Sequence, residues 1–208
     1  MRVLNACEES QAGCIAFRDK GHEAYSCDLQ ECSGGHPEWH IKGDVLNILG
    51  GGTFKTQSGD TVTIDKWDMM IGHPYCTYNT NAANKWLTVD SSQSTVAERL
   101  VLRDEGLVFF KALLDAPIEK ICLENPQPHP YVYTKVGRFQ DKVQPWMFGE
   151  PETKGLCLWL KNLPPLMSTV IESVRDDVKH KLPPGPERTK LRSKSYPKVM
   201  EAMADQWG

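Results

Sequence analysis

Strand-like and helix-like hydrophobic patterns alternate along the first 126 residues, and this alternation constrains the fold more than any other feature of the sequence. Segments with helical spacing, at 10–20 and 94–115, separate short apolar runs of strand length. The runs expected to be strands lie at 2–6, 22–27, 40–45, 67–72 and 118–123. Strands that alternate with helices are typical of βαβ units and of a mostly parallel sheet, so the sequence predicts an α/β protein.

The pattern changes toward the C-terminus. A glycine-rich hairpin is expected at 50–65, and from Val143 onward short strands at 143–148, 156–160 and 168–173 are separated by proline and glycine. A last helix is expected at 193–207. A chain of 208 residues fits one structural domain. We therefore predict a core at 1–142 and a short C-terminal extension of the same domain at 143–208.

The composition excludes several classes of protein. Hydrophobic residues make up 40% of the chain and charged residues 25%, as in ordinary folded proteins. No apolar run approaches the roughly 18 to 20 residues that span a bilayer. The residues Met1 to Asn5 lead directly into acidic Glu8 without a secretory signal, so we expect a soluble, cytoplasmic protein without a membrane partner. The seven cysteines are odd in number and scattered, which indicates reduced thiols.

Charge is unevenly distributed along the chain. Residues 179–198 contain seven basic side chains and one acidic side chain, a net charge of +6, while the whole chain carries −3 and the remainder therefore −9. A basic segment of this kind can face phosphates. It can equally be a solvated tail.

Four chemically interesting side chains follow predicted strands of the core: Asp28, Asp44, Cys76 and Glu124. Ligands of parallel sheets bind at the carboxyl ends of strands, where all four fall. A thiol in a loop beside a carboxyl group is a pattern for nucleophilic catalysis. The alternative for Cys76 is a buried small hydrophobe, and the alternative for the two aspartates is to cap helices or turns.

Two motifs carry a family resemblance. Pro74-Tyr75-Cys76 resembles the Pro-Cys nucleophile loop of the DNA cytosine-5 methyltransferases, and Glu124-Asn125-Pro126 resembles their Glu-Asn-Val segment. The stretches 36–40, 144–149 and 157–166 resemble the small phage and prophage branch of that family in particular. The resemblance extends over nearly the whole chain.

The resemblance implies a Rossmann-like class I methyltransferase fold and an enzyme that transfers a methyl group from S-adenosylmethionine to C5 of cytosine in DNA. Cys76 would attack C6 of a cytosine flipped out of the duplex, and Glu124 would hydrogen-bond the N3 and N4 edge of the base. Arg192 is the candidate for a third catalytic residue. A role in modifying phage DNA, and so in evading restriction, is the expected biological setting.

The remaining site residues follow from the same resemblance. We expect the cofactor to contact Cys7, Glu8, Asp28, Asp44 and Pro74. We expect the DNA substrate to contact Tyr75, Asn79, Asn81, Asn125, Pro126 and Arg188. The asparagines that follow Cys76 can alternatively be turn formers. No metal is expected in this scheme, and the sequence does not predict an oligomeric state.

Three alternatives stay open. The spacing Cys27-x4-Cys32-x3-His36-x3-His40 offers four zinc ligands, which would suit a nucleic-acid binding module without catalysis. The loop 5–11 contains no glycine, whereas the family's cofactor loop is usually Phe-x-Gly-x-Gly, so a one-carbon donor other than S-adenosylmethionine is a second alternative. Because the chain has no large recognition domain, a free deoxycytidine nucleotide is an alternative substrate.

Overall fold

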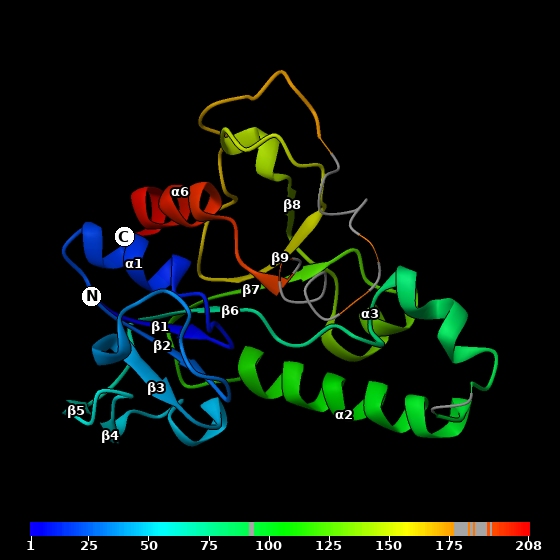
Figure 1. The fold of residues 1–208 in the computed structure, drawn as a ribbon, viewed down its shortest axis with the longest axis horizontal. Coiled ribbons are helices and arrows are strands. Elements are labelled where there is room, and N and C mark those ends of the chain that lie inside the picture. The colour runs from blue at the N-terminus through cyan, green and yellow to red at the C-terminus, as the bar shows by residue number, and fades with distance from the viewer. Residues whose placement is uncertain (92–93, 177–182, 184, 186–190, 192) are drawn as a thin grey trace.

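A seven-stranded sheet forms the centre of the computed structural model, which describes residues 1–91, 94–176, 183, 185, 191 and 193–208 (Figure 1). The strand order across the sheet is β3-β2-β1-β6-β7-β9-β8. The strands of this sheet are β1 (Arg2–Ala6), β2 (Glu23–Asp28), β3 (His40–Lys42), β6 (Met69–Gly72), β7 (Lys120–Pro126), β8 (Asp141–Val143) and β9 (Leu156–Lys161). A separate hairpin pairs β4 (Gly52–Lys55) with β5 (Thr61–Ile64).

The five strands from β3 to β7 are parallel, and β9 runs antiparallel between β7 and β8. The order reverses at β1, where the chain crosses from β3 to the other side of the sheet to form β6. A reversal of this kind is typical of doubly wound sheets and opens a crevice at the carboxyl ends of the strands. The predicted α/β class, with a mostly parallel Rossmann-like sheet and flanking helices, is confirmed.

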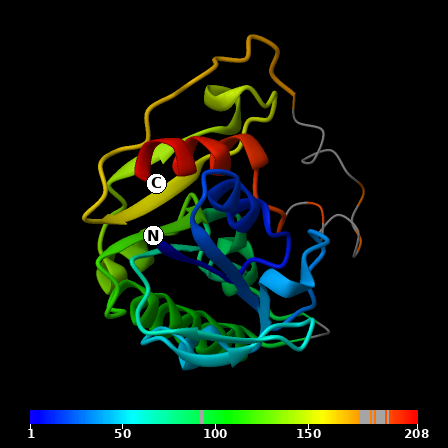
Figure 2. The ribbon, with the colours of Figure 1, turned by 90° about the vertical axis from the view of Figure 1, so that its left-hand side faces the viewer.

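Helices cover both faces of the sheet. Helices α1 (Ala12–Asp19) and α6 (Pro197–Trp207) lie side by side on one face, while α2 (Val96–Leu114) lies on the other and contacts α3 (Pro130–Val136) (Figures 1 and 2). Strand residues alternate between the two layers, as a pleated strand requires. In β1, Val3 belongs to the cluster beneath α1 and α6, and Leu4 belongs to the cluster beneath α2.

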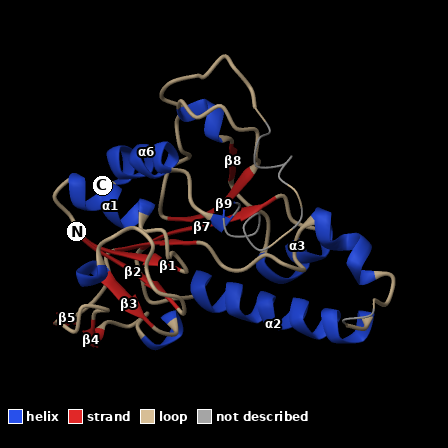
Figure 3. Ribbon diagram, viewed as in Figure 1, coloured by secondary structure: helices blue, strands red, loops and turns tan. Residues whose placement is uncertain are grey.

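Most predicted elements of residues 1–126 are confirmed, with shifts of a few residues at their ends (Figure 3). The third strand is shorter than expected, because the chain turns after Lys42 and forms a 3-10 helix at Val45–Asn47. The hairpin at 50–65 is present as β4 and β5, and its turn places Gly59 at a φ of +98°. Glycine adopts this left-handed conformation without a steric penalty.

Predictions for the last third of the chain are partly wrong. Residues 145–148 form a 3-10 helix instead of a strand, because Pro145 fits the first turn of a helix and cannot donate to a strand ladder. The segment 168–173 forms no strand, since its two backbone bonds, from Thr169 and Glu172, go to that 3-10 helix. The last helix starts at Pro197, four residues later than predicted. Helix α3 was not predicted.

No helix in the described part of the chain combines the length and the apolar composition needed to cross a bilayer.

Candidate active site

A cavity of about 580 Å³ opens at the carboxyl ends of the parallel strands. The loops that follow β1, β2, β3 and β6 form most of its wall, and α2 and the segment preceding α6 complete it. Its described lining residues are Cys7, Glu8, Glu9, Ser10, Cys27, Asp28, Leu29, Gln30, Gly43, Asp44, Val45, Leu46, His73, Tyr75, Phe109, Ser193 and Ser195. The cavity therefore lies where a doubly wound sheet binds its ligand.

The first loop of the cavity turns without glycine. Cys7 and Gln11 adopt left-handed backbone conformations, with φ values of 58° and 61°. The Glu8 carboxylate accepts hydrogen bonds from the backbone N–H groups of Gly13 at 2.8 Å and Cys14 at 3.3 Å, at the start of α1. A side chain of the protein thus occupies the helix N-terminus, which carries partial positive charge.

Asp28 ends β2, and Asp44 lies two residues after the end of β3. Each accepts a hydrogen bond from the backbone N–H two residues later, Gln30 and Leu46, at 2.9 Å in both cases. Both also line the cavity. The capping role and the cavity-lining role, which the sequence left as alternatives, are therefore combined in the same side chains.

The two thiols beside these aspartates are uncharged. Burial and the negative charges of Asp28 and Asp44 raise the pKa of Cys27 to about 12. Burial and the same carboxylates, together with Cys27, raise the pKa of Cys7 well above its ordinary value. A protonated thiol is a poor nucleophile, so these cysteines contribute surface and not reactivity.

The loop that carries Cys76 lies against the end of β7. The amide Nδ2 of Asn125 donates to the carbonyl of Pro74 at 3.2 Å, which ties the two predicted motifs together. Within the loop, the backbone N–H of Asn79 donates to the carbonyl of Cys76 at 3.0 Å. Cys76 itself is partly exposed. The structure thus brings together the two sequence motifs, although they are about 50 residues apart in the chain.

A buried ion pair lies behind this loop. The Nδ1 atom of His73 is 3.2 Å from Oε2 of Glu124, and Nε2 of His73 is 3.4 Å from Oγ of Ser195. Burial lowers the pKa of His73, but its hydrogen bond with Glu124 and the charge of that carboxylate outweigh burial and raise the pKa overall. Burial raises the pKa of Glu124, but Lys154 and His73 outweigh burial and lower it overall. Both shifts favour the ionised form of the pair, imidazolium and carboxylate.

Three buried acceptor oxygens near this loop have no partner in the described part of the protein. They are Oε1 of Glu124, Oδ1 of Asn79 and Oδ1 of Asn125. A buried polar atom without a hydrogen bond is costly, and such atoms often mark the place of a ligand. The three oxygens are suited to a substrate that presents N–H donors.

The predicted site residues are distributed as follows. Of the five cofactor candidates, Cys7, Glu8, Asp28 and Asp44 line the cavity and Pro74 does not. Tyr75, a substrate candidate, lines the same cavity. Asn81 begins the 3-10 helix Asn81–Leu87, and Pro126 ends β7. Arg188 and Arg192 lie outside the described residues.

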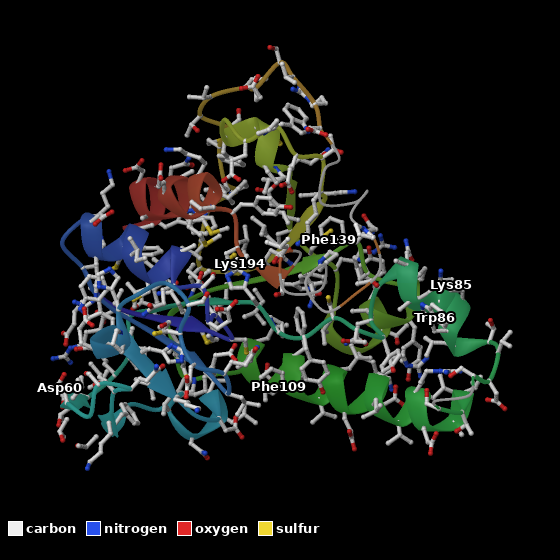
Figure 4. The ribbon with its side chains drawn as sticks, in the orientation of Figure 1. Asp60, Lys85, Trp86, Phe109, Phe139 and Lys194 are labelled. Carbon is white, nitrogen blue, oxygen red and sulfur yellow. The ribbon has the colours of Figure 1, made fainter. Side chains whose placement is uncertain are left out.

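The sequence analysis missed several lining residues of the site, among them His73, Phe109, Ser193 and Ser195. His73 carried a usable signal, because it directly follows a predicted strand, as Asp28 and Asp44 nearly do. The two serines lie within the basic segment 179–198, just before the last helix, and Phe109 lies in the C-terminal half of α2 (Figure 4). Nothing in their local sequence indicates a cavity.

The residues of the zinc alternative do not form a metal site. Both ring nitrogens of His40 have partners, Oγ of Ser26 at 2.8 Å and the carbonyl of Gln30 at 2.9 Å. The ring of His36 stacks on Trp39 with centroids 3.8 Å apart. Among the residues that the structure describes, no group of three or more His, Cys, Asp or Glu side chains is arranged to hold a metal ion.

Comparisons with known proteins find similarity among solved structures. No family model matches the chain, and no curated protein matches it. The chain is similar to the crystal structure of a candidate DNA modification methyltransferase encoded within an E. coli prophage, with 14% sequence identity and a TM-score of 0.48. The alignment covers 88% of this chain and 55% of that protein, so the chain spans about half the length of the similar structure.

Proposed function

We propose that this protein is an S-adenosylmethionine-dependent methyltransferase that acts on C5 of cytosine in DNA, with Cys76 as the nucleophile. The observation that carries the proposal is that the nucleophile loop continues directly from the wall of the acidic cavity. The cavity extends to His73 and Tyr75, and Cys76 is the next residue of that loop. The loop is tied to the end of β7, the strand of Glu124, by the hydrogen bond from Asn125 to Pro74 and by the contact of His73 with Glu124.

The chemistry of the cavity fits the proposed cofactor. Four acidic residues line it, Glu8, Glu9, Asp28 and Asp44, and none of its described lining residues is lysine or arginine. Carboxylates accept hydrogen bonds from ribose hydroxyls and attract the positive charges of the methionine part, while Leu29, Val45 and Leu46 offer apolar surface to an adenine ring. The same negative charge disfavours donors that carry phosphates or several carboxylates.

The reaction depends on the side chains of this loop and strand end. The bound cofactor would supply an electrophilic methyl group. Sγ of Cys76 would bond to C6 of cytosine, which moves the C5–C6 π electrons toward C5 and makes that carbon nucleophilic. C5 would bond the methyl carbon as the sulfur–carbon bond of the donor breaks. Loss of the C5 proton to water and cleavage of the Sγ–C6 bond would then restore the ring and release the thiolate. The Cys76 thiol must therefore act as a thiolate during attack.

Glu124 would hold the Watson–Crick edge of the base. Its Oε2 atom is engaged by His73, which leaves the unpartnered Oε1 atom for the substrate. A carboxylate at this place accepts the exocyclic N4–H and favours the N3-protonated form, so that negative charge does not accumulate in the ring during attack. The unpartnered amide oxygens of Asn79 and Asn125 would accept further N–H groups.

The test is mass spectrometry of nucleosides from cytosine-containing DNA incubated with the protein and S-adenosylmethionine. We expect one added methyl group on deoxycytidine with the natural protein and with Cys32→Ala, a control at another partly exposed cysteine that does not line the cavity. Cys76→Ala and Cys76→Ser should give no product and no covalent complex with 5-fluorocytosine DNA. Unchanged turnover in either Cys76 variant would overturn the mechanism.

A further inference from the structure

Tyr75 connects the nucleophile loop with the acidic cavity. It is the chain neighbour of Cys76, and its side chain lines the acidic cavity. The ring is 49% exposed and stacks on Phe109 of α2, with ring centroids 5.7 Å apart and an angle of 23° between the planes. Phe109 lines the same cavity. One end of the cavity wall is therefore a stacked pair of aromatic rings.

The helix beneath the pair leaves room for it. A Cβ atom at Gly106 would come within 2.9 Å of Cε2 of Tyr75, so only glycine allows the ring its present place. Gly106 and Phe109 are three positions apart and share a face of α2. Burial and the charge of Glu105 raise the pKa of the Tyr75 phenol, which keeps the ring neutral. Both rings present an electron-rich face, which attracts cations.

The position of this pair suits one part of the proposed cofactor. This inference rests on the proposed function, in which the methyl group must lie next to a base that Cys76 holds. The cavity residue closest to Cys76 in the chain is Tyr75. The atom that carries the methyl group in S-adenosylmethionine is a positively charged sulfonium. We propose that Tyr75 and Phe109 form an aromatic wall that binds this sulfonium and so selects the charged methyl donor over its uncharged thioether product.

The wall has a consequence for the catalytic cycle. After transfer, the sulfur of S-adenosylhomocysteine is neutral and loses its attraction to the ring faces, while the contacts of the adenine and ribose are unchanged. A cation over an aromatic ring contributes roughly 3- to 30-fold in affinity. The aromatic wall therefore weakens product binding relative to donor binding by about that factor and favours product release.

The test compares two ligands by calorimetry on the whole protein: S-adenosylmethionine and S-adenosylhomocysteine. The measured quantity is the ratio of their dissociation constants, because a change in the shape of the wall affects both ligands, whereas removal of the cation–ring attraction affects only the first. Tyr75→Phe should keep the natural ratio. Tyr75→Leu and Phe109→Leu should each reduce the preference for the charged ligand by roughly 3- to 30-fold. Thermal melts would establish that each variant is folded.

The matched control is Trp86→Leu. Trp86 is as exposed as Tyr75, at 50%, and does not line the cavity, so its replacement should leave the ratio unchanged (Figure 4). An unchanged ratio in both Tyr75→Leu and Phe109→Leu would overturn the aromatic wall while leaving the proposed function intact. A reduced ratio in Tyr75→Phe would assign the effect to the hydroxyl and also overturn it. If the natural protein binds neither ligand, the proposed cofactor fails and the aromatic wall with it.

Discussion

One imidazole, that of His73, joins parts of the chain that are far apart in sequence. Its partners Glu124 and Ser195 lie 51 and 122 positions further along the chain. Local patterns of hydrophobicity and turn chemistry cannot predict contacts between residues so far apart in sequence. The sequence therefore identified Glu124 from its place at a strand end, but not its partner His73. The ionised pair fixes the orientation of Glu124, because its Oε2 atom is committed to His73.

The pair makes stability depend on pH in a defined direction. The pKa of His73 is raised above its ordinary 6.5, so its contribution to the free energy of unfolding is complete below about pH 6.5 and is lost as pH rises through the folded-state pKa. The pKa of Glu124 is lowered from 4.5, so its contribution is lost only as pH falls below that range. The pair therefore stabilises most between these limits.

His73→Gln tests this dependence, since glutamine keeps a donor but cannot be protonated. Urea unfolding at pH 6 and pH 9 should show that the stability advantage of the natural protein over the variant shrinks at the higher pH. The change is about 1.4 kcal/mol for each unit by which the pKa is raised. His22→Gln is the control, because burial lowers the pKa of His22 and predicts a change of opposite sign. A pH-independent difference for His73→Gln would contradict an ionised pair.

Helix α2 supports the nucleophile loop. It starts with a capping box, in which Thr95 and Glu98 exchange hydrogen bonds with each other's backbone N–H. At its middle, Gly106 lets the loop approach the helix: an added Cβ would meet Tyr75 at 2.9 Å and Nδ2 of Asn79 at 3.0 Å. These two residues flank Cys76 in the loop, so the helix limits how closely the loop that carries Cys76 can approach it.

Gly106→Ala should separate stability from function. Alanine is the better helix former by about 1 kcal/mol, which offsets the cost of the close contact, so the melting temperature should change little. The loop must shift to admit the Cβ atom, and a shift of this size at reacting groups lowers turnover by up to roughly 100-fold. Product formation and thermal melts would be measured together. Gly50→Ala, where nothing lies within 4 Å, should change neither. Full activity in Gly106→Ala would contradict this role of α2.

The elements that sequence predicted well are those whose hydrophobic pattern matches their burial. Strand β6 is an example, since Met69 and Ile71 belong to one core cluster and Met70 to the other. In helix α2 the match is partial: Leu107, Phe110 and Leu113 are in the core, whereas Val101, Leu102 and Val108 are exposed. Helix α3 was missed because it is short and two prolines, Pro126 and Pro128, stand just before it. A tertiary contact supports it: the Arg103 guanidinium lies 3.8 Å from the ring centroid of Tyr131. The segment 168–173 was wrongly predicted as a strand because it contains Val170 and Ile171. Both side chains are exposed, so these apolar residues do not mark a buried strand.

At the scale of the whole molecule, the two ends of the chain build one layer and complete the site. Helix α6 packs on α1, and Lys20 and Asp205 form an ion pair between them. Ser193 and Ser195, just before α6, reach the cavity wall. The cavity at the carboxyl end of β1 is thus closed by residues from the other end of the chain. The strand ends of this site could be predicted from the sequence. That the C-terminal segment packs against them is seen only in the folded structure.

Charge at this scale distinguishes a polymer from a free nucleotide as substrate. The segment 179–198 carries +6 and the remainder of the chain −9, and Ser193 and Ser195 of the cavity wall lie within the segment. If the protein contacts three to six phosphates of the DNA, counterions are released from the DNA. The affinity of the protein for DNA should then fall roughly 40- to 2,000-fold between 50 and 200 mM salt. A free deoxycytidine nucleotide would show almost no such dependence. The measurement is the affinity for a cytosine-containing oligonucleotide over this range.

Substitution of three lysines of the segment tests where the phosphates bind. The combined change Lys179→Gln, Lys181→Gln and Lys190→Gln should lower the slope of log affinity against log salt by about 0.7 to 0.9 for each phosphate that a replaced lysine had neutralised. The control is Lys55→Gln, Lys66→Gln and Lys111→Gln, which removes the same charge from outside the segment. Equal slopes in both triple variants would show that net charge alone attracts DNA. A flat slope in the natural protein, together with methylation of the free nucleotide, would replace DNA by the nucleotide as substrate, because counterion release is unavoidable when a polyanion binds.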